Sequence, residues 1–365
     1  MIHISKPIIT EKDIADVAAV MRSGMIVQGP RVKELEERFA DYVGAKHAVA
    51  VTNGTAALHA ALYALGVGPG DEVITTPFTF VATANAILMQ GAKVVFVDID
   101  EETYNISPEA VEAAITDKTK AILPVSLYGL PYDQRINKIA KAKNLFVLED
   151  AAQSIGAGIG TKKSGSLADI SSFSMYATKN IMAAEGGMIT TDNEEWAELC
   201  RRFRHHGQSA QTRYQYFDIG YNYRMTDIHA AIGLNQLARV EEFTEKRNAN
   251  ASYLTQQLAE IDGLTTPSCP DGWRHAYHQY TIRVGEELSL SRDQLKEKLI
   301  ENGVGAGIYY PKPLHLHLHF EKFGYKAGDF PKAEKVALEV LSLPVHPSLS
   351  EEDLLKIVSE FKSII

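Results

Sequence analysis

One lysine, Lys179, stands between an apolar segment and a glycine turn, a setting in which its amine could act as a nucleophile. It lies in SSFSMYATKNIMAAEGGMITTD, after an expected strand and before the turn at 185–187. A lysine in apolar surroundings has a lowered pKa, and its neutral amine can form a Schiff base with a carbonyl. Ser174, in the same segment, could hydrogen-bond a phosphate. The alternative is an ordinary surface lysine in a loop.

Two acids, Glu149 and Asp150, end the otherwise apolar segment LFVLED. Burying a carboxylate is costly unless a cation pairs with it, and a protonated aromatic ring nitrogen is such a cation. Asp150 would keep that nitrogen protonated, so that the ring can accept electrons during a reaction. Gln153, which follows closely, could hydrogen-bond the same ligand. The alternative is a carboxylate that caps the next helix.

Two further segments could hold the rest of a phosphorylated aromatic ligand. In VAVTNGTAALHAAL a strand turns into a helix, so free N–H groups and the Thr55 hydroxyl could bind a phosphate that Gly54 lets approach closely. In TTPFTFVATAN, Phe78 and Phe80 follow a strand end, where ligands of α/β sheets bind, and an aromatic side chain could stack on a ring. The alternatives are a plain helix cap and two core residues of the next helix.

Strands that alternate with helices must position these residues. Apolar strands are expected at 46–52, 71–76, 93–99, 120–126 and 145–150, and helices at 55–66, 78–91, 107–116 and 133–144. This alternation predicts an α/β fold with a mostly parallel central sheet flanked by helices. The strands are almost fully apolar, as strands buried on both faces should be.

A smaller α+β domain is expected after residue 240. A long polar helix at 240–261 leads to breaker-rich residues 263–273, and then to a strand at 278–284, a helix at 291–303, a short strand at 304–310 and two final helices. We therefore predict a large domain over 1–240, with the N-terminal segment included, and a small C-terminal domain over 241–365.

Composition narrows the class of protein. The chain has 365 residues and a net charge of −9, which disfavours nucleic acid as a partner. Its two distant cysteines, Cys200 and Cys269, are expected to be reduced thiols. The N-terminus lacks the apolar core of a signal peptide, and no apolar run approaches about 18 residues, so we expect a cytoplasmic protein without a membrane partner.

Two histidine-rich segments admit other interpretations. HLHLHF places His315, His317 and His319 at alternating positions, where a metal site is conceivable. We expect no metal there and instead a loop that shapes the ligand pocket. RRFRHHG, at 201–207, is expected to be a solvated helix end.

Taken together, the order of phosphate cradle, stacking ring, carboxylate and lysine resembles fold-type I enzymes that use pyridoxal phosphate (PLP). More specifically, the chain resembles the DegT/DnrJ/EryC1/StrS family of sugar-nucleotide aminotransferases nearly end to end. The segments that carry the resemblance include GMIVQGPRVKELEERFADYVGAKHAVAVTNGTAAL, LEDAAQSIGA, SFSMYATKN, EGGMITTD, GYNYRMTDIHAAIGL, YHQYTIRV, GIYYPKPLHL and LSLPVHP.

The resemblance implies a role for each matched residue. Lys179 would bind the cofactor as a Schiff base and move the proton, and Asp150 would pair with the ring nitrogen. The remaining cofactor contacts would be Phe80 and Gln153 at the ring, and Gly54, Thr55, Ser174 and Asn222 at the phosphate. Asn222 would come from the neighbouring subunit, which implies an obligate homodimer. Substrate candidates are Arg224, Tyr309, Tyr310, Lys312 and His315.

The implied reaction moves an amino group from L-glutamate to a keto sugar attached to a nucleoside diphosphate, giving an amino sugar nucleotide. Arg224 and Lys312 would bind the diphosphate. Relatives that dehydrate sugars carry histidine in place of the lysine, so Lys179 disfavours that activity. An enzyme acting on small amino or keto acids would need an arginine for the substrate carboxylate, and Arg283 is the candidate. A regulatory PLP-binding protein and a PLP-free α/β protein are further alternatives.

Overall fold

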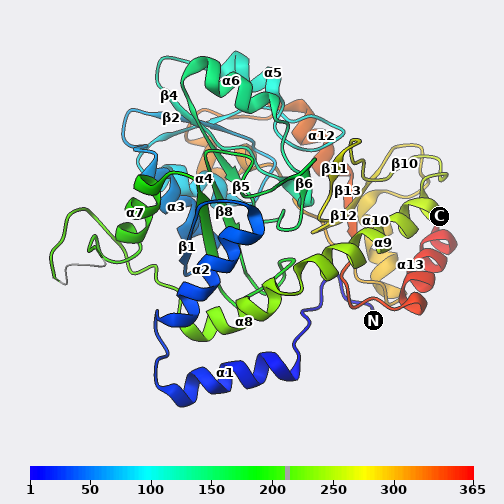
Figure 1. Cartoon of the computed structure of the whole chain (residues 1–365). Helices are drawn as coiled ribbons and strands as arrows, with labels where there is room; N and C mark the ends of the chain where they lie inside the picture. The colour runs from blue at the N-terminus through cyan, green and yellow to red at the C-terminus, as the bar shows by residue number, and fades with distance from the viewer. Residues whose placement is uncertain (210–213) are drawn as a thin grey trace.

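The computed structural model describes residues 1–209 and 214–365 and is built around a seven-stranded sheet (Figure 1). Its strand order is β1-β9-β8-β5-β4-β2-β3, and neighbours are parallel except where β9 runs antiparallel to β1 and β8. The strands are β1 (His47–Val51), β2 (Glu72–Thr75), β3 (Lys93–Phe96), β4 (Thr119–Ile122), β5 (Phe146–Asp150), β8 (Ile170–Ser174) and β9 (Gly187–Thr191). The predicted α/β fold with a mostly parallel sheet is confirmed.

Helices cover both faces of this sheet. The helices of the first two thirds of the chain are α1 (Glu11–Ser23), α2 (Pro30–Val43), α3 (Gly54–Ala64), α4 (Val81–Met89), α5 (Pro108–Ala114), α6 (Arg135–Lys143), α7 (Glu194–Phe203) and α8 (Asp227–Leu237), with a short 3-10 turn at Leu127–Gly129. Alternate residues of β1 face opposite layers: Val49 and Val51 pack with α3 and α7, whereas Ala48 and Ala50 pack with α2 and α8. The apolar strands predicted from the sequence are therefore buried on both faces.

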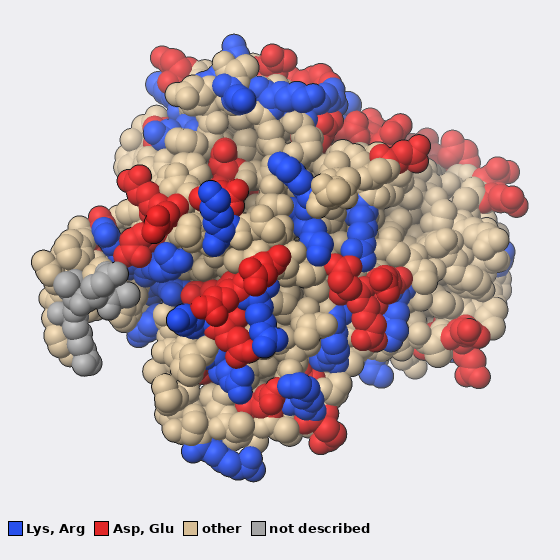
Figure 2. All heavy atoms as spheres, viewed as in Figure 1, with Lys and Arg blue, Asp and Glu red and all other residues tan. Residues whose placement is uncertain are grey.

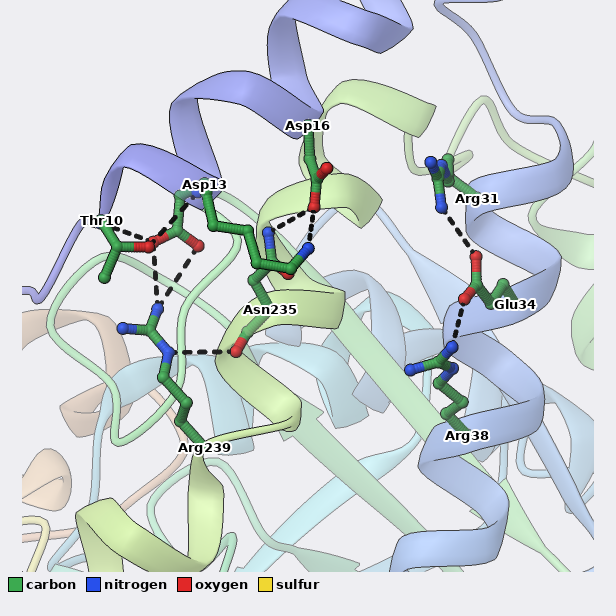
Figure 3. A network of polar contacts seen from close by, with 9 residues as sticks. Thr10, Asp13, Asp16, Arg31, Glu34, Arg38, Asn235 and Arg239 are labelled. Carbon is green, nitrogen blue, oxygen red and sulfur yellow. Dashed lines mark hydrogen bonds and ion pairs between the residues drawn. The ribbon is translucent and has the colours of Figure 1, made fainter.

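Helix α1 lies outside the sheet layers, alongside α8 (Figure 1). Figure 3 shows how polar side chains fasten it there: Arg239 pairs with the buried Asp13 at 3.0 Å, and Asn235 donates to Asp16 at 2.9 Å. Asp13 also accepts from Thr10 in a capping box that starts α1. One ion pair and one hydrogen bond thus join α1 to Asn235 and Arg239 at the end of α8 and just after it.

The C-terminal part begins with α9 (Val240–Leu258), which runs out of the large body (Figure 1). It contains a three-stranded sheet in the order β10-β12-β13, and a small separate sheet has the order β11-β6-β7. The elements are β6 (Gly158–Ile159), β7 (Lys162–Lys163), β10 (Leu264–Thr265), β11 (Trp273–Arg274), β12 (Tyr280–Val284), β13 (Val340–Leu343), α10 (Arg292–Glu301), α11 (Leu318–Glu321), α12 (Pro331–Glu339), α13 (Glu351–Ile364) and a 3-10 turn at Leu314–Leu316.

Two sequence expectations for this part are corrected. The predicted strand at 304–310 is wrong, because it forms only single bridges, from Val304 to Ile2 and from Gly307 to Ser342. The strand β12 instead pairs with β10 and with β13, which lies between the two final helices, where the sequence predicts no strand. Among the described residues, no helix is both long and apolar enough to cross a membrane.

The division at residue 240 stays a prediction, but the packing crosses it in both directions. Ile2 packs in the C-terminal core with Leu254 and Tyr280. Conversely, Phe320 and Phe330 pack in the core of the large sheet, against Phe96.

Candidate active site

A cavity of about 700 Å³ lies at the carboxyl ends of the parallel strands and brings together most of the predicted site residues. Those that line it are Gly54, Thr55, Phe80, Asp150, Gln153, Ser174, Lys179, Tyr309 and Tyr310. They come from segments more than 250 residues apart in the chain, and the sheet edge gathers them as expected for an open α/β sheet.

The N-terminus of α3 forms a cradle against β8. A Cβ atom added to Gly54 would lie 2.9 Å from the Cβ of Ser174, so only glycine allows this approach. The Asn53 side chain accepts from Ala56 N at 2.9 Å. Within the described residues, the N–H groups of Gly54 and Thr55 have no protein acceptor. These donors and the helix dipole suit a phosphate.

The two acids of β5 point to opposite sides of the sheet. Glu149 is enclosed by donors, accepting from Ser126 at 2.7 Å, Gly165 N at 3.0 Å and Ser171 at 3.1 Å. Asp150 faces the cavity, where its carboxylate accepts from Thr83 at 2.8 Å. Burial raises the pKa of Asp150, and no described lysine, arginine or histidine forms an ion pair with it. A buried carboxylate in this state suits a cationic ligand.

Lys179 lies in the turn after β8, facing the same cavity. Burial lowers the pKa of its amine to about 8, an effect that the charge of Asp150 opposes. The sequence had suggested a lysine in apolar surroundings, and the structure gives Lys179 the lowered pKa that such surroundings produce.

Aromatic side chains and an amide form the rest of the wall. Phe80 caps the start of α4 and is 57% exposed, whereas Phe78 is fully buried, so of the two only Phe80 is free to stack on a ligand. Its ring centroid is 6.3 Å from that of Tyr310. Gln153 donates to the Tyr310 hydroxyl at 3.3 Å and accepts from Tyr128 N at 2.8 Å, which fixes its amide.

Four predicted site residues do not line this cavity in the single chain: Asn222, Arg224, Lys312 and His315. Asn222 is exposed and forms a bridge with His205, and Arg224 contacts His205 Nδ1 at 2.7 Å. Lys312 is exposed. His315 is fully buried, with its Nε2 2.9 Å from Glu334, so the structure places it in the core rather than in the pocket wall.

Two other expectations change in the structure. Arg204 is not part of a solvated helix end: it is 5% exposed, pairs with Glu36 and donates to Ala50 O at 2.6 Å. Arg283 is held by Glu339 at 2.5 Å, so it is not free to bind a substrate carboxylate. The described residues contain no cluster of three or more histidine, cysteine, aspartate or glutamate side chains arranged for a metal.

Sequence reasoning missed several lining residues, among them Thr83, Tyr176, Tyr223 and His278. Thr83 could have been found from helical spacing, since it lies one turn after Thr79 at the start of α4. His278 gave no such signal, because it precedes a strand of the C-terminal part and reaches the cavity only through tertiary folding.

Comparison with known proteins agrees with this geometry. The profile of the DegT/DnrJ/EryC1/StrS aminotransferase family matches residues 7–362. The chain is 42% identical over 340 residues to GDP-perosamine synthase of Caulobacter vibrioides, covering 92% of this chain and 91% of that protein. It is 40% identical over 343 residues to UDP-2-acetamido-2-deoxy-3-oxo-D-glucuronate aminotransferase of Pseudomonas aeruginosa, covering 93% of this chain and 92% of that protein.

A solved structure extends the agreement to the fold. The PLP form of Spr1654 from Streptococcus pneumoniae superimposes with a TM-score of 0.93 at 32% identity, over 100% of this chain and 98% of that one. The chain is therefore an aminotransferase that belongs to the DegT/DnrJ/EryC1/StrS aminotransferase family.

Proposed function

We propose that this aminotransferase uses PLP to move an amino group from L-glutamate to a keto sugar attached to a nucleoside diphosphate, giving an amino sugar nucleotide. The names of the two relatives support a nucleotide-linked sugar. The observation that carries the proposal is the presence, in one cavity, of a low-pKa lysine and a buried carboxylate that forms no ion pair with a described basic side chain.

The residues of the cavity fit the cofactor. The α3 N-terminus, Thr55 and Ser174 would hold the phosphate, since Gly54 leaves room for it and the N–H groups of Gly54 and Thr55 have no acceptor among the described residues. Asp150 would meet the ring nitrogen, and Phe80 would cover a face of the ring.

PLP, when bound, supplies an aldehyde that links to amines and a ring that delocalises the electrons left when a proton is removed. The neutral Nζ of Lys179 takes the α-proton of the amino donor and holds it as an ammonium until it is returned within the cavity. Asp150 keeps the ring nitrogen protonated through its negative charge. Phe80 and Tyr310, which both line the cavity, would limit the entry of water.

For the sugar nucleotide, we propose Tyr309 and Tyr310 as contacts of the sugar, and Arg224 and Lys312 as partners of the diphosphate. Tyr309 and Tyr310 already line the cavity. His315 is left out of this set, because its imidazole is buried against Glu334.

The activity is tested by supplying L-glutamate with a panel of GDP- and UDP-linked keto sugars and measuring 2-oxoglutarate and the amino sugar. We expect turnover with at least one of these acceptors, and none with Lys179→Ala. A higher kcat/KM for free keto acids than for every sugar nucleotide would contradict the proposal.

We further propose a cytoplasmic homodimer in which Asn222 reaches the phosphate site of the partner. The exposure of Asn222, away from its own cavity, supports this arrangement. Subunit exchange tests it: Lys179→Ala and Asn222→Ala proteins should each have little activity, and mixing them should restore one intact site per heterodimer. No recovery on mixing, with exchange verified by differently tagged subunits, would place Asn222 outside the site.

A further inference from the structure

The segment 275–278, which precedes β12, is held by side-chain donors from two directions. From α9, Asn248 donates to His275 O at 2.9 Å and Arg247 to Tyr277 O at 2.9 Å. From the lysine turn, Asn180 donates to Ala276 O at 2.9 Å. Arg247 is 5% exposed and forms no ion pair with a described carboxylate, and the acceptors for its guanidinium are the carbonyl groups of Tyr277 and His278.

The end of this segment is His278, which is 9% exposed and lines the same cavity as Lys179. Its Nδ1 lies 3.2 Å from Oδ1 of Asn180, the residue that follows Lys179 in the chain. The orientation of the Asn180 amide group follows from its other hydrogen bond, in which Nδ2 donates to Ala276 O. Its Oδ1 can only accept, so Nδ1 of His278 carries the proton in this bond.

This leaves Nε2 of His278 with a lone pair. Within the described residues, Nε2 has no protein partner. Because this atom is also not buried, it is open to the cavity. Burial, followed by the charges of Lys179 and Arg247, holds the pKa of His278 well below its ordinary value, and the ring stays neutral at pH 7.

We propose that His278 is a positioning residue whose neutral Nε2 accepts a hydrogen bond from the Lys179 ammonium and so stabilises Lys179 in its proton-carrying state. The inference rests on the proposed role of Lys179 in moving the substrate proton. In that role Lys179 alternates between amine and ammonium, and a fixed acceptor favours the charged form. Among the described residues, the charged and titratable groups that interact with the pair are Asp150 and Arg247.

Two substitutions separate the two ring nitrogens. His278→Asn keeps a donor near Nδ1 for Asn180 and removes the acceptor at Nε2, whereas His278→Gln places an acceptor near Nε2. The amine of Lys179 is followed in cofactor-stripped protein by acetic anhydride labelling across pH, with mass spectrometry of the Lys179 peptide. Thermal unfolding tests whether both variants are folded.

The wild-type labelling midpoint is expected near pH 8. His278→Asn should lower it by about one pH unit, because one hydrogen bond to a charged group is lost, and His278→Gln should stay within a few tenths of the wild type. Asn180→Leu removes the acceptor that keeps the proton on Nδ1 of His278 and leaves the imidazole ring itself unchanged. It should shift the midpoint in the same direction as His278→Asn. Equal midpoints in wild type and His278→Asn, or equal shifts in the Asn and Gln variants, would overturn the inference.

The glutamate half-reaction gives a second measurement. His278→Asn should lower its maximal rate by about 10-fold or more with little change in the half-saturating glutamate concentration, and His278→Gln should recover most of it. A wrong amino donor would abolish the half-reaction in the wild type as well while leaving the labelling result intact, so the two failures are distinguishable.

Discussion

Burial governs the ionisation of both reacting side chains in the cavity. It raises the pKa of Asp150, against the opposing effect of the Thr83 hydroxyl, and lowers that of Lys179 to about 8, against the charge of Asp150. Each shift favours the neutral form of the group. A neutral amine is what proton removal requires, whereas a protonated ring nitrogen beside Asp150 would favour the charged form of its carboxylate.

Replacing Asp150 with asparagine should keep the shape of the site and remove its charge. Without that charge the ring nitrogen loses its proton, so we expect the glutamate half-reaction to slow by about 100-fold or more. Stopped-flow absorbance of the cofactor-loaded protein measures this rate. Thr83→Val removes the hydrogen bonds of the Thr83 hydroxyl with Asp150 and Thr79 and keeps the charge of Asp150, so it is the milder control, with an expected loss of about 10-fold. A wild-type rate in Asp150→Asn would exclude a role for its charge.

The lowered pKa of Lys179 also has a cost in stability. The unfolded chain binds a proton on this lysine more tightly than the folded chain, so below pH 8 the group destabilises the fold, and the effect fades as pH rises towards 10.5. At pH 7, the free energy of unfolding of cofactor-stripped Lys179→Met, measured with urea, should therefore be about 2 kcal/mol higher than that of the stripped wild type. The difference should shrink by pH 10, and a pH-independent difference would refute this explanation.

At the scale of elements, a buried carboxylate joins α8 to α2. Asp227, the first residue of α8, is 1% exposed and accepts from Gly29 N at 2.9 Å, Val32 N at 2.9 Å and Arg31 N at 3.2 Å. These are N–H groups at the start of α2, where a negative charge is favourable. One side chain thereby joins the starts of two helices that pack on each other.

Asp227→Ala should lower the free energy of unfolding by about 2–4 kcal/mol, because several buried N–H groups would lose their acceptor. Urea unfolding monitored by circular dichroism gives the value. The matched control is Glu242→Gln, whose partner Lys246 is one helical turn away on an exposed face; that change should stay within about 0.5 kcal/mol. Similar losses in both variants would mean that the Asp227 contacts add little.

Periodicity in the sequence predicted one of the following two strands correctly and the other wrongly. LFVLED was correctly predicted as a strand, and β5 ends at Asp150 as expected. The strand predicted at 304–310 did not form, because residues there meet Ile2 on one side and Ser342 on the other at single positions. A local pattern favours extended backbone, but only the neighbouring strands determine whether a ladder forms.

At the scale of the whole molecule, each part of the chain completes the other. Ile2 packs in the C-terminal core, Phe330 packs in that of the large sheet, and Tyr309 and His278 come from the C-terminal part to line the cavity. Figure 2 shows side chains of both charges interspersed over the visible face, so the net charge of −9 is not gathered there into one patch.

Because the cavity is built from both parts, cofactor binding should stabilise the molecule as a unit. A ligand that binds only the folded state at 100 times its Kd contributes about 2.7 kcal/mol. We expect the Tm of the PLP-loaded protein to exceed that of the stripped protein by several degrees, in one transition, and the gain to be smaller in Lys179→Ala. Differential scanning calorimetry measures both; a gain confined to an early transition of one part would contradict the shared site.

The sequence by itself determined the class of fold and the chemistry-bearing residues of the large domain. Apolar strand runs, a glycine before a helix, and an acid and a lysine after strands are local features, and the topology of a parallel sheet brings such strand ends to one edge. The tertiary structure decided which of the two acids faces the cavity, that Phe80 rather than Phe78 is exposed, and that His315 is enclosed by Glu334 and Phe330. It also brought His278 beside the lysine turn. Side-chain direction and burial depend on what packs against each element, and that information is spread over residues far apart in the chain.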